Sequence, residues 1–121
     1  MFNRLFANLF PPQPENVQFV DPVQVKEWHK AGDVILVDVR ETGEFAAERI
    51  PGAVNLPLSS FDPAKVPVVE GKNLVIHCRS GSRCGMAAAR LAAAGFEGPI
   101  NRMQGGIMGW KMVGGSTRSG A

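Results

Sequence analysis

Apolar residues fall in short runs separated by polar, Gly- and Pro-containing segments along most of the chain. The two strongest runs, 34–39 and 73–77, are almost continuously apolar and carry β-branched residues, which is typical of strands buried on both faces of a parallel sheet. Shorter runs of the same kind predict further strands over 17–20, 53–56 and 99–103.

Helical segments separate these strands. Asp21 and Pro22 are typical of a helix start, with Asp as N-cap and Pro in the first turn, and Gly32 is the expected stop. A short helix is expected within 40–48, an Ala-rich helix over 85–94 and a closing helix over 107–112. The alternation predicts an α/β fold, a three-layer sandwich with a central, mostly parallel sheet flanked by helices.

Composition is consistent with one globular domain. The 121 residues are 45% apolar and 20% charged, and no apolar stretch approaches the roughly 18 residues that span a bilayer. We expect an N-terminal extension and linker over 1–16, a domain over 17–113 and a solvated tail over 114–121. Two cysteines are too few for a disulfide framework and lack zinc-site spacing, so we expect reduced thiols, a cytoplasmic location, and no metal or cofactor.

Charge is unevenly distributed along the chain. The net charge is +2, but residues 1–70 carry 10 acids and 6 bases, whereas residues 71–121 carry 1 acid and 7 bases. The second half should therefore favour a small anionic substrate. Nucleic acid is not favoured as a partner, because the basic residues form no run and lack interleaved aromatic residues.

The first ten residues have apolar side chains at helical spacing. This spacing is compatible with a helix that lies on a membrane surface or docks on a partner, but packing on the domain or a frayed terminus is the favoured interpretation. The apolar positions are Phe2, Leu5, Phe6, Leu9 and Phe10.

The most informative segment follows the 73–77 strand, which ends directly before Cys78. The next residues are small, flexible or cationic, so their backbone N–H groups can turn inward around an anion or a charged sulfur. An unperturbed cysteine with a pKa near 8.5 is only about 3% thiolate at pH 7, but a helix N-terminus and neighbouring cations lower that pKa. Cys78 is therefore the candidate nucleophile, an inert core cysteine being the alternative. The candidate binding residues are Arg79, Ser80, Gly81, Ser82 and Arg83.

Other polar residues near this segment receive structural interpretations. Cys84 should pack in the first turn of the following helix, with a resolving or relay thiol as the alternative; a disulfide to Cys78 would demand a short separation that a wide loop does not guarantee. His77 should point away from Cys78, because adjacent strand residues face opposite sides. Asp38 and Arg40 are expected to form a hydrogen-bonded pair that supports the edge of the site rather than to act in catalysis.

Four motifs in this order resemble the single-domain rhodaneses, a family of sulfurtransferases, over about residues 18–112. The motifs are Val37-Asp38-Val39-Arg40-Glu41, with Glu44-Phe45 after it, Ile50-Pro51-Gly52-Ala53-Val54-Asn55-Leu56-Pro57, Cys78-Arg79-Ser80-Gly81-Ser82-Arg83, and Gly105-Gly106-Ile107-Met108-Gly109-Trp110. Where most of the family has a histidine before Ile50, this chain has Arg49, so no role of that histidine is carried over.

The resemblance implies a rhodanese-like sandwich and a persulfide mechanism. The Cys78 thiolate would attack the outer sulfur of a donor and pass that sulfur to a thiophilic acceptor such as cyanide, a thiol or a protein. Thiosulfate is the expected donor, with Arg79 and Arg83 on its sulfonate end and the loop amides around the transferred sulfur.

Two other functions are compatible with the same residues. One is a non-enzymatic carrier of sulfane sulfur or a module that docks a partner. The other is a cysteine phosphatase or arsenate reductase, whose loop resembles Cys-x5-Arg; this chain has Cys-x4-Arg, which leaves less room for a tetrahedral oxyanion.

Overall fold

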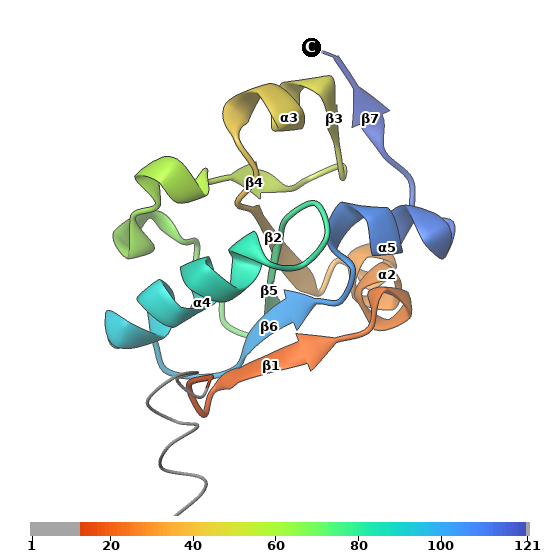
Figure 1. Ribbon diagram of the computed structural model, residues 1–121. Helices are drawn as coiled ribbons and strands as arrows, with labels where there is room; N and C mark the ends of the chain where they lie inside the picture. Colours follow the sequence, from red (N-terminus) through yellow and green to blue (C-terminus); the bar gives the residue numbers. More distant parts are fainter. Residues whose placement is uncertain (1–12, 121) are drawn as a thin grey trace, which may run out of the picture.

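In the computed structural model, which describes residues 13–120, five parallel strands form one sheet in the order β1-β6-β5-β2-β4 (Figure 1). The helix considered for residues 1–10 lies outside the described residues. The apolar runs explain β2 and β5, since each has a neighbouring strand on both sides. The strands are β1 Val17–Val20, β2 Val34–Asp38, β4 Val54–Asn55, β5 Asn73–His77 and β6 Ile100–Met103.

Helices cover both faces of the sheet and complete three layers, which confirms the predicted α/β sandwich. One face carries α4, and the other carries α2 and α5, which contact each other (Figure 1). Two 3-10 turns lie in the connection between β4 and β5. The helical elements are α2 Pro22–Ala31, α3 Thr42–Ala47, η1 Leu58–Ser60, η2 Pro63–Lys65, α4 Arg83–Ala93 and α5 Gly106–Met112.

Two apolar cores hold these layers together. On the α4 side, Ile76 and Ile100 of the sheet pack with Leu91, and all three side chains are buried. On the other side, Val25 of α2 and Trp110 of α5 pack against the sheet in the same way. Full burial of such side chains contributes about 1.5–3 kcal/mol each, so both helical layers are fixed by apolar packing.

Local signals place the first helix as expected. The carboxylate of Asp21 accepts a hydrogen bond from the backbone N–H of Val23 at 2.7 Å, Pro22 occupies the first turn, and Gly32 caps the end. At α4 the structure differs from the sequence prediction, because the helix begins at Arg83, two residues before Gly85. The loop between β5 and α4 is correspondingly shorter.

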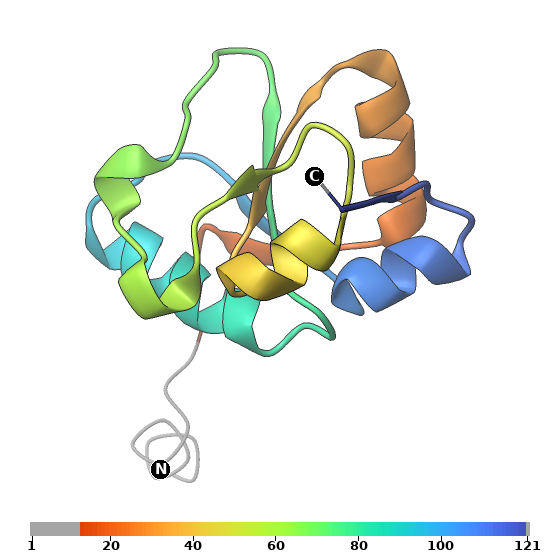
Figure 2. The ribbon, with the colours of Figure 1, turned by 90° about the horizontal axis from the view of Figure 1, so that it is seen from above.

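The segment after residue 113 is mostly exposed, yet it is paired with another part of the domain. Strand β7, Arg118–Ser119, pairs antiparallel with β3, Glu48–Arg49, so the C-terminal segment returns to the loop beyond α3 (Figure 2). The indole Nε1 of Trp110 also donates a hydrogen bond to the carbonyl of Ser116 at 2.8 Å. The Thr117 hydroxyl donates to the Glu48 carboxylate at 2.8 Å, so backbone pairing and side-chain hydrogen bonds together hold a segment whose own residues are mostly polar.

Parallel strands put their carboxyl ends at one edge of the sheet, where ligands of α/β folds bind. Asp38 ends β2 at this edge, Cys78 follows β5 directly, and Gly105 lies between β6 and α5. Within residues 13–120, no helix is long and apolar enough to cross a membrane.

Candidate active site

Cys78 lies at the carboxyl edge of the sheet, between the end of β5 and the first turn of α4. Its side chain is buried, and its sulfur accepts a hydrogen bond from the backbone N–H of Gly81 at 3.1 Å. A non-glycine residue would be strained at position 81, because φ there is +119°. The loop therefore folds back over the sulfur at a residue that suits this backbone conformation.

Several hydrogen-bond donors stabilise a negative charge on this sulfur. The thiol of Cys84 contributes most and the backbone N–H groups of Cys84, Gly81 and Ser80 add to it, so that together they lower the pKa of Cys78 to about 5 although burial raises it. A pKa this far below 7 makes the thiolate the dominant form of Cys78 at neutral pH. The site thus contains an ionised nucleophile in a nest of N–H donors.

The start of α5 holds the loop in place from the other side. The backbone N–H of Ile107 donates to the carbonyl of Cys78 at 2.9 Å, and that of Met108 donates to the carbonyl of Arg79 at 3.2 Å. A Cβ on Gly106 would lie 2.4 Å from the Cys78 oxygen and 2.6 Å from the Arg79 carbonyl. Glycine is needed at 106 for this contact, and φ of +58° adds to the requirement.

Arg83 is not a free cation. Its guanidinium forms two hydrogen bonds with the Glu44 carboxylate, at 2.6 and 2.9 Å. The Arg83 contact is the main cause that lowers the pKa of Glu44 to about 2, so the pair is charged at neutral pH. This finding differs from the sequence interpretation, in which Arg83 was available for the sulfonate end of a donor.

Arg79 is exposed beside the site and lines a hollow next to the loop. Glu44 and Glu48 lie in this hollow together with Lys111, which pairs with Glu48 at 3.0 Å. Ser80 and Ser82 are exposed on the loop itself. Of the two expected arginines, Arg79 is therefore the one whose guanidinium has neither a hydrogen bond nor an ion pair with residues 13–120.

Asp38 and Arg40 lie together beneath this edge. The Arg40 guanidinium donates to the Asp38 carboxylate at 2.7 to 3.1 Å, and both side chains are almost completely buried. Arg40 also donates to the backbone carbonyl of Glu48 at 2.6 Å. Each charge thus has partners in the interior, and the pair joins the end of β2 to the segment after α3.

The His77 side chain is fully buried and makes no hydrogen bond to the Cys78 sulfur. Burial lowers the pKa of His77, so the imidazole is neutral, and its Nε2 lies 3.8 Å from the Asp38 carboxylate. Its Nδ1 is 3.4 Å from the backbone oxygen of Cys78. Neither ring nitrogen has a hydrogen bond to the Cys78 sulfur, so the ring shows no contact suited to a general base for that thiol.

Two further residues near the thiolate had no assigned role in the sequence interpretation. The sequence analysis places Glu44 in a family motif without a role, and it does not single out Arg102. Arg102 lies on β6 and donates a hydrogen bond to the carbonyl of Gly81 at 2.9 Å. The available signal was its position near the carboxyl end of a parallel strand, the same argument that singled out Cys78.

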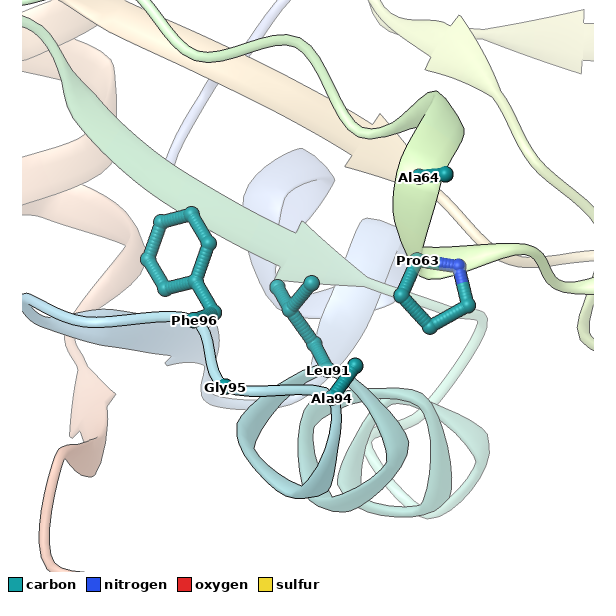
Figure 3. A pocket seen from close by; sticks show the side chains of 6 residues that line it. All are labelled: Pro63, Ala64, Leu91, Ala94, Gly95 and Phe96. Atoms are coloured by element: carbon teal, nitrogen blue, oxygen red, sulfur yellow. The ribbon is translucent and has the colours of Figure 1, made fainter.

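One further hollow lies away from the thiolate. The hollow in Figure 3 lies at the C-terminal end of α4, whereas Cys78 lies at its N-terminal end, and its lining is mainly apolar. It carries no nucleophile or charged side chain. The lining residues are Pro63, Ala64, Leu91, Ala94, Gly95 and Phe96. No group of three or more metal-ligating side chains occurs within the described part of the chain.

Comparison with known proteins identifies the family. The model of the rhodanese-like domain matches residues 21–113, and the chain belongs to this family. An uncharacterized protein of Synechocystis is 42% identical over 95 residues, which cover 78% of this chain and 52% of that protein. A sulfurtransferase of Allochromatium vinosum is 37% identical over 78 residues, 64% of this chain and 72% of that protein.

Solved structures agree on the fold. The crystal structure of a thiosulfate sulfurtransferase from Pseudomonas aeruginosa aligns with a TM-score of 0.77 at 19% identity, covering 99% of this chain and 22% of that one. The family resemblance and the predicted fold class are thereby confirmed. This chain spans about half the length of the cyanobacterial relative.

Proposed function

We propose that the chain is a sulfurtransferase that accepts sulfane sulfur from thiosulfate as a persulfide on Cys78 and passes it to a thiophilic acceptor. The observation that carries the proposal is the ionised Cys78 sulfur inside a ring of N–H donors. Similarity to a sulfurtransferase over most of that protein's length supports the same reaction class.

The reaction has two steps. The Cys78 thiolate attacks the outer sulfur of thiosulfate, a new S–S bond forms, and sulfite leaves with the electron pair of the old one. An acceptor then attacks the outer sulfur of the persulfide; cyanide gives thiocyanate, a thiol gives a new persulfide, and Cys78 returns as thiolate. The loop amides of Ser80 and Gly81 stabilise the anionic sulfur in both steps.

The donor is held by charge at the mouth of the loop. Arg79 is exposed there without a protein partner among residues 13–120, and its fork of N–H groups matches a sulfonate. Arg83, paired with Glu44, holds the start of α4 in place and orients the loop. Asp38 and Arg40 support the edge beneath it. We assign the reducing cytoplasm as the compartment, since Cys78 and Cys84 are both free thiols.

The test is the mass of the intact protein after incubation with thiosulfate, together with the sulfite released. The expected result is one added sulfur atom per chain and one equivalent of sulfite, followed by thiocyanate when cyanide is added. Cys78→Ser should show none of these changes, whereas Ser60→Ala, at an exposed position in η1 outside the loop, should keep them. An unchanged mass of the parent protein with every sulfur donor overturns the proposal.

The same measurement separates the alternatives. A persulfide that forms but reaches only a protein acceptor indicates a carrier of sulfane sulfur. Turnover of a chromogenic phosphate ester or of arsenate, without persulfide formation, indicates the phosphatase or reductase that shares this loop type.

A further inference from the structure

The buried Cys84 thiol lies near the Cys78 sulfur, and both sulfurs contact the backbone of Gly81. Cys84 lies in the first turn of α4, and its sulfur lies 3.0 Å from the carbonyl oxygen of Gly81. The sulfur of Cys78 accepts from the N–H of the same glycine at 3.1 Å. Both side chains are buried and contact the same glycine, and the Cys84 thiol interacts with the Cys78 sulfur, so the loop brings the two sulfurs together.

A cation accompanies this second thiol. The guanidinium of Arg102 binds the Gly81 carbonyl at 2.9 Å, the same oxygen that the Cys84 thiol contacts. The Arg102 side chain passes directly over Gly85, because a Cβ at residue 85 would lie 2.8 Å from Nη2 of Arg102. On its outer side it stacks on the ring of Phe19 at 4.4 Å. Phe19 and the missing side chain at Gly85 together fix Arg102 beside Cys84.

Opposing influences act on the Cys84 proton. The hydrogen bond to Cys78, burial and the charge of Cys78 raise the pKa of Cys84, while Arg102 lowers it. When Cys78 carries a persulfide, its negative charge moves to the outer sulfur, about 2 Å farther along the S–S bond. The repulsion on Cys84 then weakens while Arg102 stays in place, so Cys84 becomes more acidic once the sulfur has been loaded.

We propose, on the basis of the proposed sulfurtransferase function, that Cys84 is a resolving thiol that attacks the Cys78 sulfur of the persulfide and releases the outer sulfur as hydrosulfide. The Cys84–Cys78 S–S bond forms while the bond between Cys78 and the outer sulfur breaks. The Cys84 proton leaves with the hydrosulfide, so the charge is conserved. The sulfane sulfur is reduced by two electrons and the two thiols are oxidised to a disulfide.

The loop suits this step because the N–H groups that hold the thiolate also stabilise the departing hydrosulfide anion. A small dithiol reductant then restores both thiols by exchange. With such a reductant present, the domain releases sulfide from thiosulfate without cyanide or another external sulfur acceptor.

The test uses the full, reduced chain under anaerobic conditions with thiosulfate and no other thiol. Intact mass should show one added sulfur, followed by its loss together with two hydrogens, and peptide mapping should find the Cys78–Cys84 disulfide. One equivalent of hydrosulfide per chain should appear in solution. Cys84→Ser, which keeps a donor toward Cys78, should hold the added sulfur and release no hydrosulfide.

The outcomes distinguish the two proposals. If the parent protein neither gains sulfur nor releases sulfite from thiosulfate, the proposed function fails. If it gains sulfur and keeps it on Cys78 without hydrosulfide release, or if the sulfur is found on Cys84, the resolving role is overturned while the sulfurtransferase remains. Omission of thiosulfate should leave both thiols reduced, and a disulfide in that control would attribute the bond to adventitious oxidation and overturn the inference.

Arg102 provides a second, graded test. In Arg102→Gln, hydrosulfide release should slow about tenfold at neutral pH, because a rise of one unit in the pKa of Cys84 lowers its thiolate fraction about tenfold. The rate should recover as the pH rises. Persulfide loading from thiosulfate should change less than this. Equal slowing of both steps at all pH values would mean that Arg102 only maintains the loop, and would contradict its role toward Cys84.

Discussion

Arg83 at the start of α4 and Glu44 in α3 form a two-point ion pair, at 2.6 and 2.9 Å, between positions 39 residues apart in the chain. Because Arg83 is paired, only Arg79 of the two loop arginines is left to bind a donor. The pair also links the first residue of α4 to α3. It also brings an acidic residue from the N-terminal half into the most basic part of the sequence.

Replacing Glu44 tests what the pair does to donor binding. Glu44→Gln should lower KM for thiosulfate several-fold, because the guanidinium of Arg83 becomes available to an anion beside the loop. Steady-state kinetics measures this effect. Glu70→Gln, an exposed site with the same change in net charge, is the matched control and should leave KM unchanged; an equal shift in both variants would contradict a local effect.

The same substitution should have a small effect on stability. The pair is partly exposed, so its loss should cost no more than about 1 kcal/mol in the free energy of unfolding. Because the folded state lowers the pKa of Glu44, the contribution is present above the ordinary value of 4.5 and is lost as the pH falls toward about 2. Urea unfolding of parent and variant at neutral and acidic pH should show the difference shrinking toward zero.

The pKa of Cys78 predicts an unusual reactivity profile. Alkylation of Cys78 by iodoacetamide should rise with pH around a midpoint near 5, whereas an ordinary cysteine rises near 9. Peptide mapping separates Cys78 from Cys84, which should remain unmodified over this range. Cys84→Ala removes the largest contribution and should move the midpoint upward, while Cys84→Ser should move it less; a parent midpoint above 8 would rule out the stabilised thiolate.

Breaking the buried pair beneath the site should be costly. Asp38→Asn leaves the Arg40 guanidinium buried without its carboxylate, and the expected loss is about 3–5 kcal/mol of unfolding free energy. Thermal and urea unfolding monitor it. Asp33→Asn, at an exposed position before β2, is the control and should change stability by less than about 0.5 kcal/mol. Similar values for both variants would show that the pair is dispensable.

The contact of α5 with the catalytic loop gives a steric prediction. Gly106→Ala should destabilise the protein by at least about 2 kcal/mol and reduce persulfide formation, because the new Cβ collides with the backbone of Cys78 and Arg79. Gly43→Ala, in α3, meets nothing within 4 Å and should be neutral or stabilise by up to about 1 kcal/mol. The reverse ranking of the two variants would contradict the contact.

Much of the architecture was predictable because its causes are local. The apolar runs identified β2 and β5, Asp21 and Pro22 identified the start of α2, and the position of Cys78 after a buried strand made it the candidate nucleophile. The start of α4 was placed two residues late because Arg83 and Cys84 have no strong helix signal of their own. The pairing of the C-terminal segment cannot be predicted from local sequence, because its partner, β3, lies about 70 residues earlier.

The sequence by itself determined the main strands and helices, the family motifs and the candidate nucleophile Cys78, since spacing, capping and turn residues act over a few positions. Only the tertiary structure decided that Arg83 is paired with Glu44, that Arg102 comes from β6 to Gly81, and that the Cys84 thiol faces Cys78. These relationships join segments that are distant in the chain or turn on the exact course of one loop. Charge counts and spacing carry no information on them, because they depend on which side chains the packed layers bring together.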